Sequence, residues 1–472
     1  MIDRRHFLQR AVAFGVGFAG LRVGLATAGP SGLRDLAAGG VGGFGPLVRD
    51  PAGLLDLPKG FSYQVLARYG DEMDDGLMVP GKQDAMAAFP RADGTTALAV
   101  NHEVEIPAHG PLGAFGPRDE RLNRLPVEAH YDRGVRARAG CSTIVYDTKS
   151  RSVRRRSMAL AGTVRNCAGG ATPWNTWLSC EECFDSKGEG FEQDHGYVFE
   201  CRPLDDTPLL NPRPIRAMGR FNHEAVAVDP VSGVVYLTED RSDGLLYRYI
   251  PADRADLHEG GRLQALAIKG RKGISTRNWE DSAPIAVGAR LQVEWVDVDN
   301  VDSRVDDLRY RGRERGAALF ARGEGMWYGI GPGARADSAR STARVYFACT
   351  NGGMARLGQL WRYLPSPYEG TKAESKDGGL LELFLESSDS KAIANADNLS
   401  VTPWGSLVVC EDNESEHQRL LVVASDGTMS SFARNALNAS EFAGSCFSPD
   451  ASTMFLNIQN PGITLAVHGP WR

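Results

Sequence analysis

One segment of this sequence occurs twice and decides the fold. Thr172-Pro173-Trp174-Asn175-Thr176-Trp177-Leu178-Ser179-Cys180-Glu181-Glu182 returns as Thr402-Pro403-Trp404-Gly405-Ser406-Leu407-Val408-Val409-Cys410-Glu411-Asp412. Each copy contains turn-forming residues, then an apolar strand, then two acids. A match of this length indicates that the chain is built from equivalent units.

Four looser copies share an apolar strand that ends in acidic or amide residues, at 96–103, 233–240, 344–353 and 452–460. Short strands that recur at a period of about 40 residues or more are typical of propeller blades. The sequence therefore predicts an all-β fold, a six-bladed β-propeller with inserted loops, for which residues 254–340 leave room. Its strand ends would meet at one central channel. A β-sandwich with coincidental similarity between strands is the alternative.

The rest of the chain fits a single folded unit. The 54 glycines and 25 prolines suit many tight turns. We expect one propeller domain over residues 51–472, preceded by a glycine-rich lead-in segment at 29–50.

The N-terminal residues 1–28 are typical of a signal peptide. Arg4 and Arg5 precede Phe7 and Leu8, a weakly apolar stretch follows, and Ala26-Thr27-Ala28 suits a signal peptidase. The paired arginines indicate export by the twin-arginine pathway, so we expect a periplasmic or extracellular protein. Removal of four Arg and one Asp changes the net charge from -6 to -9, because a net +3 is lost.

Charge and hydropathy exclude two classes of partner. The only basic run, at 151–156, is short, whereas a nucleic-acid interface needs an extended basic surface. No run of about 18 uncharged apolar residues follows the signal peptide, so no membrane span is expected in the mature protein. We expect a monomer that acts on a small molecule. The eight cysteines allow disulfides in an oxidising compartment without fixing any pairing.

Acids that converge on one channel repel one another, and burial makes their ionised forms costly. Few arginines lie near the repeats, so bound metal is the best explanation for the acids at the strand ends: Glu103, Glu181, Glu182, Glu239, Asp240 and Glu411. Ligand sets made of oxygen favour Ca²⁺.

Three further motifs carry candidate chemistry. Cys167 precedes Gly169-Gly170; it is either a small buried residue or a thiolate ligand for a softer metal such as iron. Asn101-His102-Glu103 recurs as Asn222-His223-Glu224, which makes Glu224 a further candidate metal ligand. Arg322 lies two residues before Glu324, and this pair is either a surface ion pair or a phosphate-binding arginine beside a metal-binding acid.

Taken together, these motifs resemble the PhoX-type alkaline phosphatase family from about residue 45 to the C-terminus. The resemblance rests on Leu57-Pro58 with Gly60-Phe61, Asn166-Cys167-Ala168-Gly169-Gly170, Thr172-Pro173-Trp174, Cys180-Glu181-Glu182, His223-Glu224, Arg322-Gly323-Glu324-Gly325, Asp397-Asn398 and Asn457-Ile458-Gln459 with Pro461-Gly462.

The resemblance implies a hub that holds two Fe³⁺ and several Ca²⁺ ions and hydrolyses phosphomonoesters at alkaline pH. It implies that Cys167 binds iron and that acids such as Glu224, with Asp397 and Asn398, complete the metal ligands. Arg322 and Glu324 would act at the substrate. Asn222 would also contact the substrate, although it stands where the family resemblance leads us to expect lysine.

Two other functions fit the same pattern. A calcium-dependent lactonase-type hydrolase would use a propeller hub but needs no thiolate. A non-catalytic binding propeller would keep metal only for stability.

Overall fold

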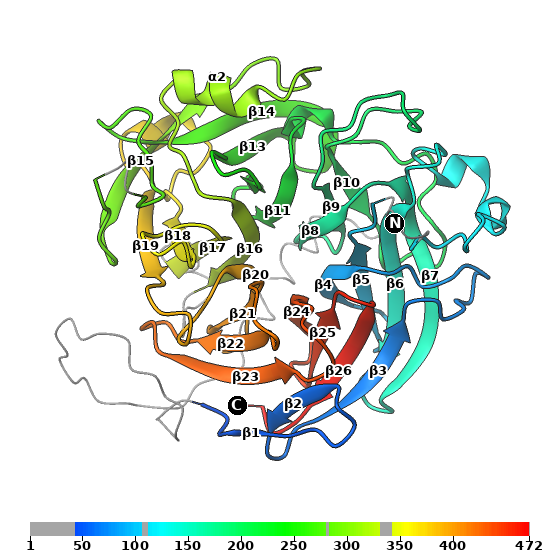
Figure 1. Ribbon diagram of the computed structural model, residues 1–472. Coiled ribbons are helices and arrows are strands. Elements are labelled where there is room, and N and C mark those ends of the chain that lie inside the picture. Colours follow the sequence, from blue (N-terminus) through cyan, green and yellow to red (C-terminus); the bar gives the residue numbers. More distant parts are fainter. Residues whose placement is uncertain (1–42, 106–111, 280–282, 331–341, 472) are drawn as a thin grey trace.

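The computed structural model describes residues 43–105, 112–279, 283–330 and 342–471. The predicted signal peptide and residues 29–42 of the predicted lead-in segment lie outside these ranges. The fold is all-β and propeller-like, with antiparallel sheets arranged around a centre (Figure 1).

Within each sheet, strands that follow one another in sequence mostly pair side by side. The first sheet comprises β4 (Gln83–Pro90), β5 (Thr96–His102), β6 (Ala139–Asp147) and β7 (Ser152–Thr163). The second comprises β8 (Asn166–Ala171), β9 (Trp177–Glu181) and β10 (Val198–Cys201).

The largest sheet contains two four-stranded meanders joined through β15 (Arg290–Asp297), which pairs with both β14 and β19. One meander is β11 (His223–Val228), β12 (Val235–Glu239), β13 (Leu246–Asp253) and β14 (Asp256–Ile268). The other is β16 (Gly323–Ile330), β17 (Ala343–Cys349), β18 (Gln359–Leu364) and β19 (Leu380–Glu386).

The last two sheets combine both ends of the described chain. In one, β20 (Ala396–Val401), β21 (Leu407–Glu411), β22 (Arg419–Val423) and β23 (Met429–Asn435) continue into β2 (Leu55–Pro58) and β1 (Leu47–Val48). In the other, β24 (Phe442–Phe447), β25 (Thr453–Ile458) and β26 (Ile463–His468) pair with β3 (Ser62–Arg68).

Helical structure is minor among the described residues and lies in the connections. It consists of α2 (Leu308–Glu314) and short 3₁₀ turns at Leu122–Arg124, Val127–Ala129, Arg216–Met218 and Lys372–Ser375. No helix in the described ranges is both long and apolar enough to cross a bilayer.

The strands predicted from the repeats are confirmed as β5, β9, β12, β17, β21 and β25, the second strand of each meander. The duplicated segment forms the same turn in both copies. Thr172 N–H donates to Thr176 O at 2.9 Å, and Thr402 N–H donates to Ser406 O at 2.8 Å. Asn175 (φ 65°) and Gly405 (φ 88°) take the left-handed position in the turn, which Asn and Gly tolerate best.

The first strand of each meander lies nearest the centre (Figure 1). Each first strand contacts the next one around the centre, in the order β4, β8, β11, β16, β20 and β24. Contacts between β24 and β4 close the ring. Apolar clusters fill the space between neighbouring sheets and bury large side chains such as Trp177, Tyr236 and Trp361. The eight cysteines are all buried and none is bridged.

Candidate metal centre

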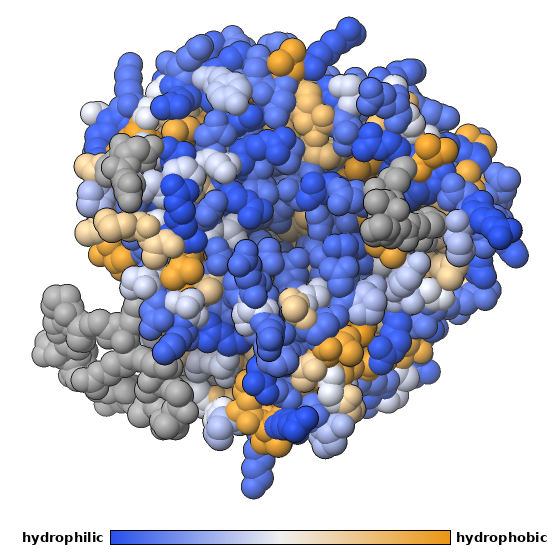
Figure 2. Space-filling view, viewed as in Figure 1, coloured by the Kyte–Doolittle hydropathy of each residue, from blue (hydrophilic) through white to orange (hydrophobic). Residues whose placement is uncertain are grey.

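A cavity of about 380 Å³ lies where the first strands meet. Hydrophilic residues occupy the middle of the corresponding face (Figure 2). The cavity is lined by Asp84, Glu103, Arg165, Cys167, Glu182, Asn222, Glu224, Asp240, Arg241, Arg322, Glu324, Asp397, Asn398, Asp412, Glu441, Ala443 and Gln459.

The same backbone feature supplies six of these side chains. In each meander the second residue of the first strand belongs to a β-bulge, because two residues of the first strand there oppose one residue of the second. A bulge re-aims the side chain that it displaces. These bulge residues are Asp84, Cys167, Glu224, Glu324, Asp397 and Ala443, and all of them line the cavity.

Two flanking positions also recur. We call the residue just before each first strand the entry residue, and the residue just after each second strand the exit residue. The exit residue N–H always donates to the entry residue carbonyl, at 2.9 to 3.3 Å. The entry residues are Lys82, Arg165, Asn222, Arg322, Asn395 and Glu441; the exit residues are Glu103, Glu182, Asp240, Thr350, Asp412 and Gln459.

Acids outnumber cations in the cavity, where nine carboxyl groups face only three guanidinium groups. Arg165 Nη2 lies 2.7 Å from Glu103 Oε1 and 2.6 Å from Glu182 Oε2. Arg322 donates to both oxygens of Asp240 at 2.8 Å, and its Nη2 lies 2.9 Å from Glu324 Oε1. Among the described residues, the other five acids of the cavity form no ion pair with an arginine or lysine: Asp84, Glu224, Asp397, Asp412 and Glu441.

Burial and mutual repulsion make ionisation of the inner acids unfavourable. Burial first, and then the neighbouring carboxyl groups, raise the pKa of Glu224 and Glu324 well above the ordinary glutamate value. The pKa of Asp397 is raised in the same way. Asp240 is the exception, because Arg322 outweighs the effect of burial and lowers its pKa.

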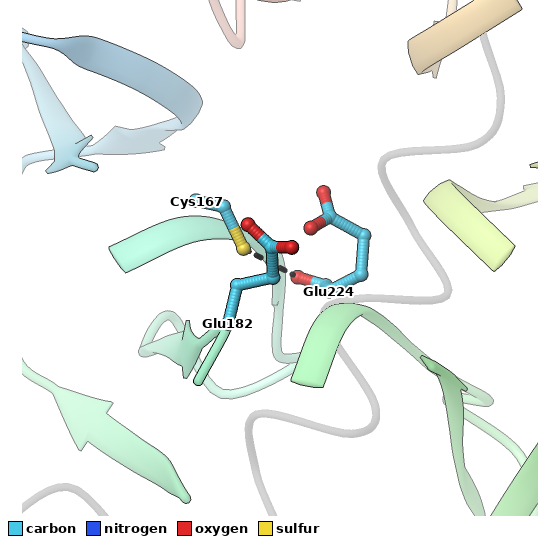
Figure 3. Close-up of side chains that lie close together, drawn as sticks. All are labelled: Cys167, Glu182 and Glu224. Atoms are coloured by element: carbon cyan, nitrogen blue, oxygen red, sulfur yellow. Dashed lines mark hydrogen bonds between the residues drawn. The ribbon is translucent and has the colours of Figure 1, made fainter. Parts of the chain in front are cut away.

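Three overlapping groups of ligand atoms extend across the cavity, and within each group the atoms lie within 4.8 Å of one another. The first group is Cys167, Glu182 and Glu224 (Figure 3). Glu224 is shared with a second group that adds Glu324 and Asp397, and Asp397 is shared with a third. That third group adds Asp412 and Glu441.

The Cys167 thiol is deep in this site. Its Sγ lies 3.4 Å from the carbonyl of His223 and 3.6 Å from that of Glu224. Burial, followed by the charges of Glu224 and Glu182, raises its pKa well above the ordinary thiol value. A cation at the first group would favour the thiolate, because opposite charge lowers a thiol pKa.

Most of the predicted site residues are brought together. Those that line the cavity are Glu103, Cys167, Glu182, Asn222, Glu224, Asp240, Arg322, Glu324, Asp397 and Asn398. Each of Glu181, Glu239 and Glu411 is the last residue of a second strand and is absent from the cavity lining.

Those three glutamates are held by other groups. Glu181 bonds to His195 Nδ1 at 2.7 Å, and Glu411 bonds to Arg419 Nη2 at 2.7 Å. Glu239 accepts from Tyr247 Oη at 3.0 Å. Successive residues of a strand point to opposite sides, so only one member of each acid pair can face the centre.

Seven of the lining residues were not among the predicted site residues: Asp84, Arg165, Arg241, Asp412, Glu441, Ala443 and Gln459. Asp412 aligns with the predicted Glu182 in the duplicated segment, and this match was the signal that could have identified it. Asp84 and Glu441 lie at the start of first strands and become recognisable only when these strands are aligned by their bulges.

The fold is similar to those of proteins of known structure. Among solved structures, the chain is similar to Pseudomonas fluorescens PhoX in complex with vanadate, a transition state analogue, with 18% identity and a TM-score of 0.64. That match covers 88% of this chain and 96% of the other.

Two further structures are less similar. A gluconolactonase from Xanthomonas campestris has 11% identity and a TM-score of 0.37, over 91% of this chain and 99% of that one. A β-propeller domain from Myceliophteria thermophila has 11% identity and a TM-score of 0.40, over 83% and 98%.

No curated protein sequence matches the chain. The family described as alkaline phosphatase PhoX matches residues 42–156 and 145–462, which include every residue of the cavity lining. The chain therefore belongs to the PhoX family of alkaline phosphatases, which are phosphoric ester hydrolases.

Proposed function

We propose that this protein hydrolyses phosphate monoesters in the central cavity, with metal ions held by its carboxylates and by Cys167. The observation that carries the proposal is the row of three overlapping ligand groups in a chain of the PhoX family. The similar structure from Pseudomonas fluorescens holds vanadate, a transition state analogue, which supports a phosphate ester as the substrate here.

The donor atoms fit a mixed set of metals. Cys167, Glu182 and Glu224 combine one sulfur with carboxylate oxygens, which suits ferric iron better than calcium. The other two groups contain only oxygen ligands and suit Ca²⁺. The buried Glu224 carboxylate has no hydrogen-bond donor among the described residues, as expected of a group that awaits a cation. Two Fe³⁺ and several Ca²⁺ ions are our proposed content.

The protein groups would mainly bind and orient the phosphate. When bound, the metal ions act as Lewis acids that neutralise the charge developing on the phosphoryl group. Asp240 fixes the Arg322 guanidinium through two hydrogen bonds and leaves its Nη1 without a partner among the described residues. That Nη1 is available to a phosphate oxygen. The Asn222 amide offers a second donor, and Thr350 holds Glu324 through a 2.7 Å hydrogen bond.

Three further parts of this proposal concern the whole chain. The recurrence of entry, bulge and exit residues supports six blades, even though two of them share one continuous sheet. We propose that they form one domain, residues 51–472. The paired arginines at positions 4 and 5 support export through the twin-arginine pathway to the periplasm or the cell exterior.

The test is hydrolysis of p-nitrophenyl phosphate by purified protein at alkaline pH. We expect turnover after loading with Fe³⁺ and Ca²⁺, and its loss after chelation because the acids would then repel one another and the phosphate. Glu224→Gln should abolish turnover, since Glu224 belongs to two ligand groups. The matched Glu128→Gln, on an exposed 3₁₀ turn, should not. Absence of phosphate release under every metal loading would reject the proposal.

A further inference from the structure

We propose that Arg241 binds the phosphoryl oxygens of the substrate, an inference that rests on the proposed phosphatase function. Arg241 directly follows the exit residue Asp240, and its side chain lines the cavity. The repeat pattern does not predict that Arg241 lines the cavity, because Arg241 lies one residue after the recurring exit position.

The partners of Arg241 differ from those of the other two cavity arginines. Arg165 and Arg322 each lie between two carboxylates of the cavity. Arg241 Nη2 instead donates to the neutral Asn222 Oδ1 at 2.8 Å. Its ion pair, at 3.2 Å, is with Asp306, which does not line the cavity. Arg241 is therefore the cavity arginine whose charge is least compensated within the cavity itself.

The guanidinium of Arg241 is also oriented for a ligand. Both contacts engage Nη2, so Nε and Nη1 have no partner among the described residues. The side chain is 34% exposed, so these donors are accessible. A planar guanidinium with two such donors matches the geometry of a phosphate group, and fixing it in advance reduces the ordering cost of binding.

Asn222 leaves the entry position of its meander without a positive charge. At the same entry position, other meanders carry Lys82, Arg165 and Arg322. Asn222 is neutral, and the Arg241 side chain brings a positive charge to its amide. The backbone N–H of Arg322 also donates to the backbone carbonyl of Arg241 at 2.9 Å, so the two arginines lie on adjoining backbone segments. Together they form a pair of donors at one side of the cavity.

The alternative role for Arg241 is a purely structural tether to the segment that contains Asp306 and α2. Two variants separate the roles. Arg241→Gln removes the cation and the tether, whereas Asp306→Asn leaves the cation in place and removes the negative charge that Asp306 offers to Arg241 and to Arg309. The metal-loaded variants should be compared with the wild type for kcat and KM with p-nitrophenyl phosphate, inhibition by vanadate, and thermal stability. Binding of inorganic phosphate should be measured directly by calorimetry.

We expect Arg241→Gln to weaken inorganic phosphate and vanadate binding by about 10- to 100-fold, the range for losing a hydrogen bond to a charged group. Arg241→Lys should recover part of this loss, and Asp306→Asn should bind phosphate at least as tightly as the wild type. Equal weakening in Arg241→Gln and Asp306→Asn, or none in Arg241→Gln, would overturn the inference. Phosphate binding that depends on Arg241 without any hydrolysis would reject the proposed activity and leave this site standing.

Discussion

Cys167 has the most distinctive chemistry of the bulge residues. Four of the other five bulge residues are acids and the fifth is Ala443, so Cys167 is the one bulge residue that offers a sulfur ligand. Cys183 is a suitable comparison because it is also buried, but packs in an apolar cluster with Ala137, Val164 and Phe191. Burial alone therefore cannot distinguish a ligand from a structural thiol.

We predict that Cys167→Ala loses iron whereas Cys183→Ala keeps it. The thiol of Cys167 belongs to a ligand group with Glu182 and Glu224, and calcium at the oxygen-only groups should be retained. Elemental analysis and the visible absorption of the iron centre measure the effect. Equal iron content in both variants would exclude Cys167 as a ligand.

At the scale of the strand, close approach between neighbouring first strands sets the spacing of the ligands. A side chain at Gly325 in β16 would place its Cβ 2.7 Å from Asn398 Cα and 2.9 Å from the Asp397 carbonyl in β20. Both contacts are with backbone, which cannot rotate away. The absence of a side chain at Gly325 is thus what lets Glu324 and Asp397 share one ligand group.

We predict that Gly325→Ala separates β16 from β20, costs about 1–3 kcal/mol of stability, and weakens calcium binding. Gly329→Ala in the same strand is the matched control. There the new Cβ would meet mainly the Val401 side chain, at 3.0 Å, which can shift. Denaturant unfolding and calcium titration of both variants test this. Unchanged calcium affinity in Gly325→Ala would show that the ligands tolerate a wider spacing.

Strands also explain how much of the site could be predicted from sequence. The apolar runs that end in acids identified the second strands, because the repeat preserves both their residues and the preceding turn. The sequence did not show which acid of each pair faces the centre. Glu181 and Glu182 differ only by one step of strand alternation, and the direction depends on the register with β8.

The first strands were harder to recognise. Asp84 and Glu441 share no residue type or local motif, and they occupy different positions of the repeat, the bulge and the entry position. What they have in common is a place beside a bulge, which is a property of the pairing between strands. Such residues become visible only once the strand register is known.

At the scale of the molecule, the concentration of buried acids links stability to both pH and metal. Glu224 and Glu324 have a raised pKa in the folded state, so these two groups keep their protons to higher pH in the folded protein than in the unfolded chain. Without metal, their contribution to stability should therefore be fully present below the usual glutamate value of 4.5 and should be lost as pH rises toward the raised values.

We predict that the melting temperature of the chelated protein falls between pH 5 and pH 9, while that of the metal-loaded protein changes much less. Bound cations favour ionised carboxylates, so metal affinity should increase with pH over the same range. Thermal unfolding at several pH values, with and without chelator, measures both trends. A chelated protein that becomes more stable with rising pH would contradict the raised pKa values of Glu224 and Glu324.

The pairing of β3 with β26 has a consequence for how the protein is made. Ile463 lies opposite Arg68, so β3 can pair with β26 only after the whole segment between them has been synthesised. Glu441 and Gln459 belong to the same late segment and reach Asp84 equally late. We therefore expect the cavity to be completed late in synthesis, and a chain truncated before Glu441 should lack these two groups at the cavity.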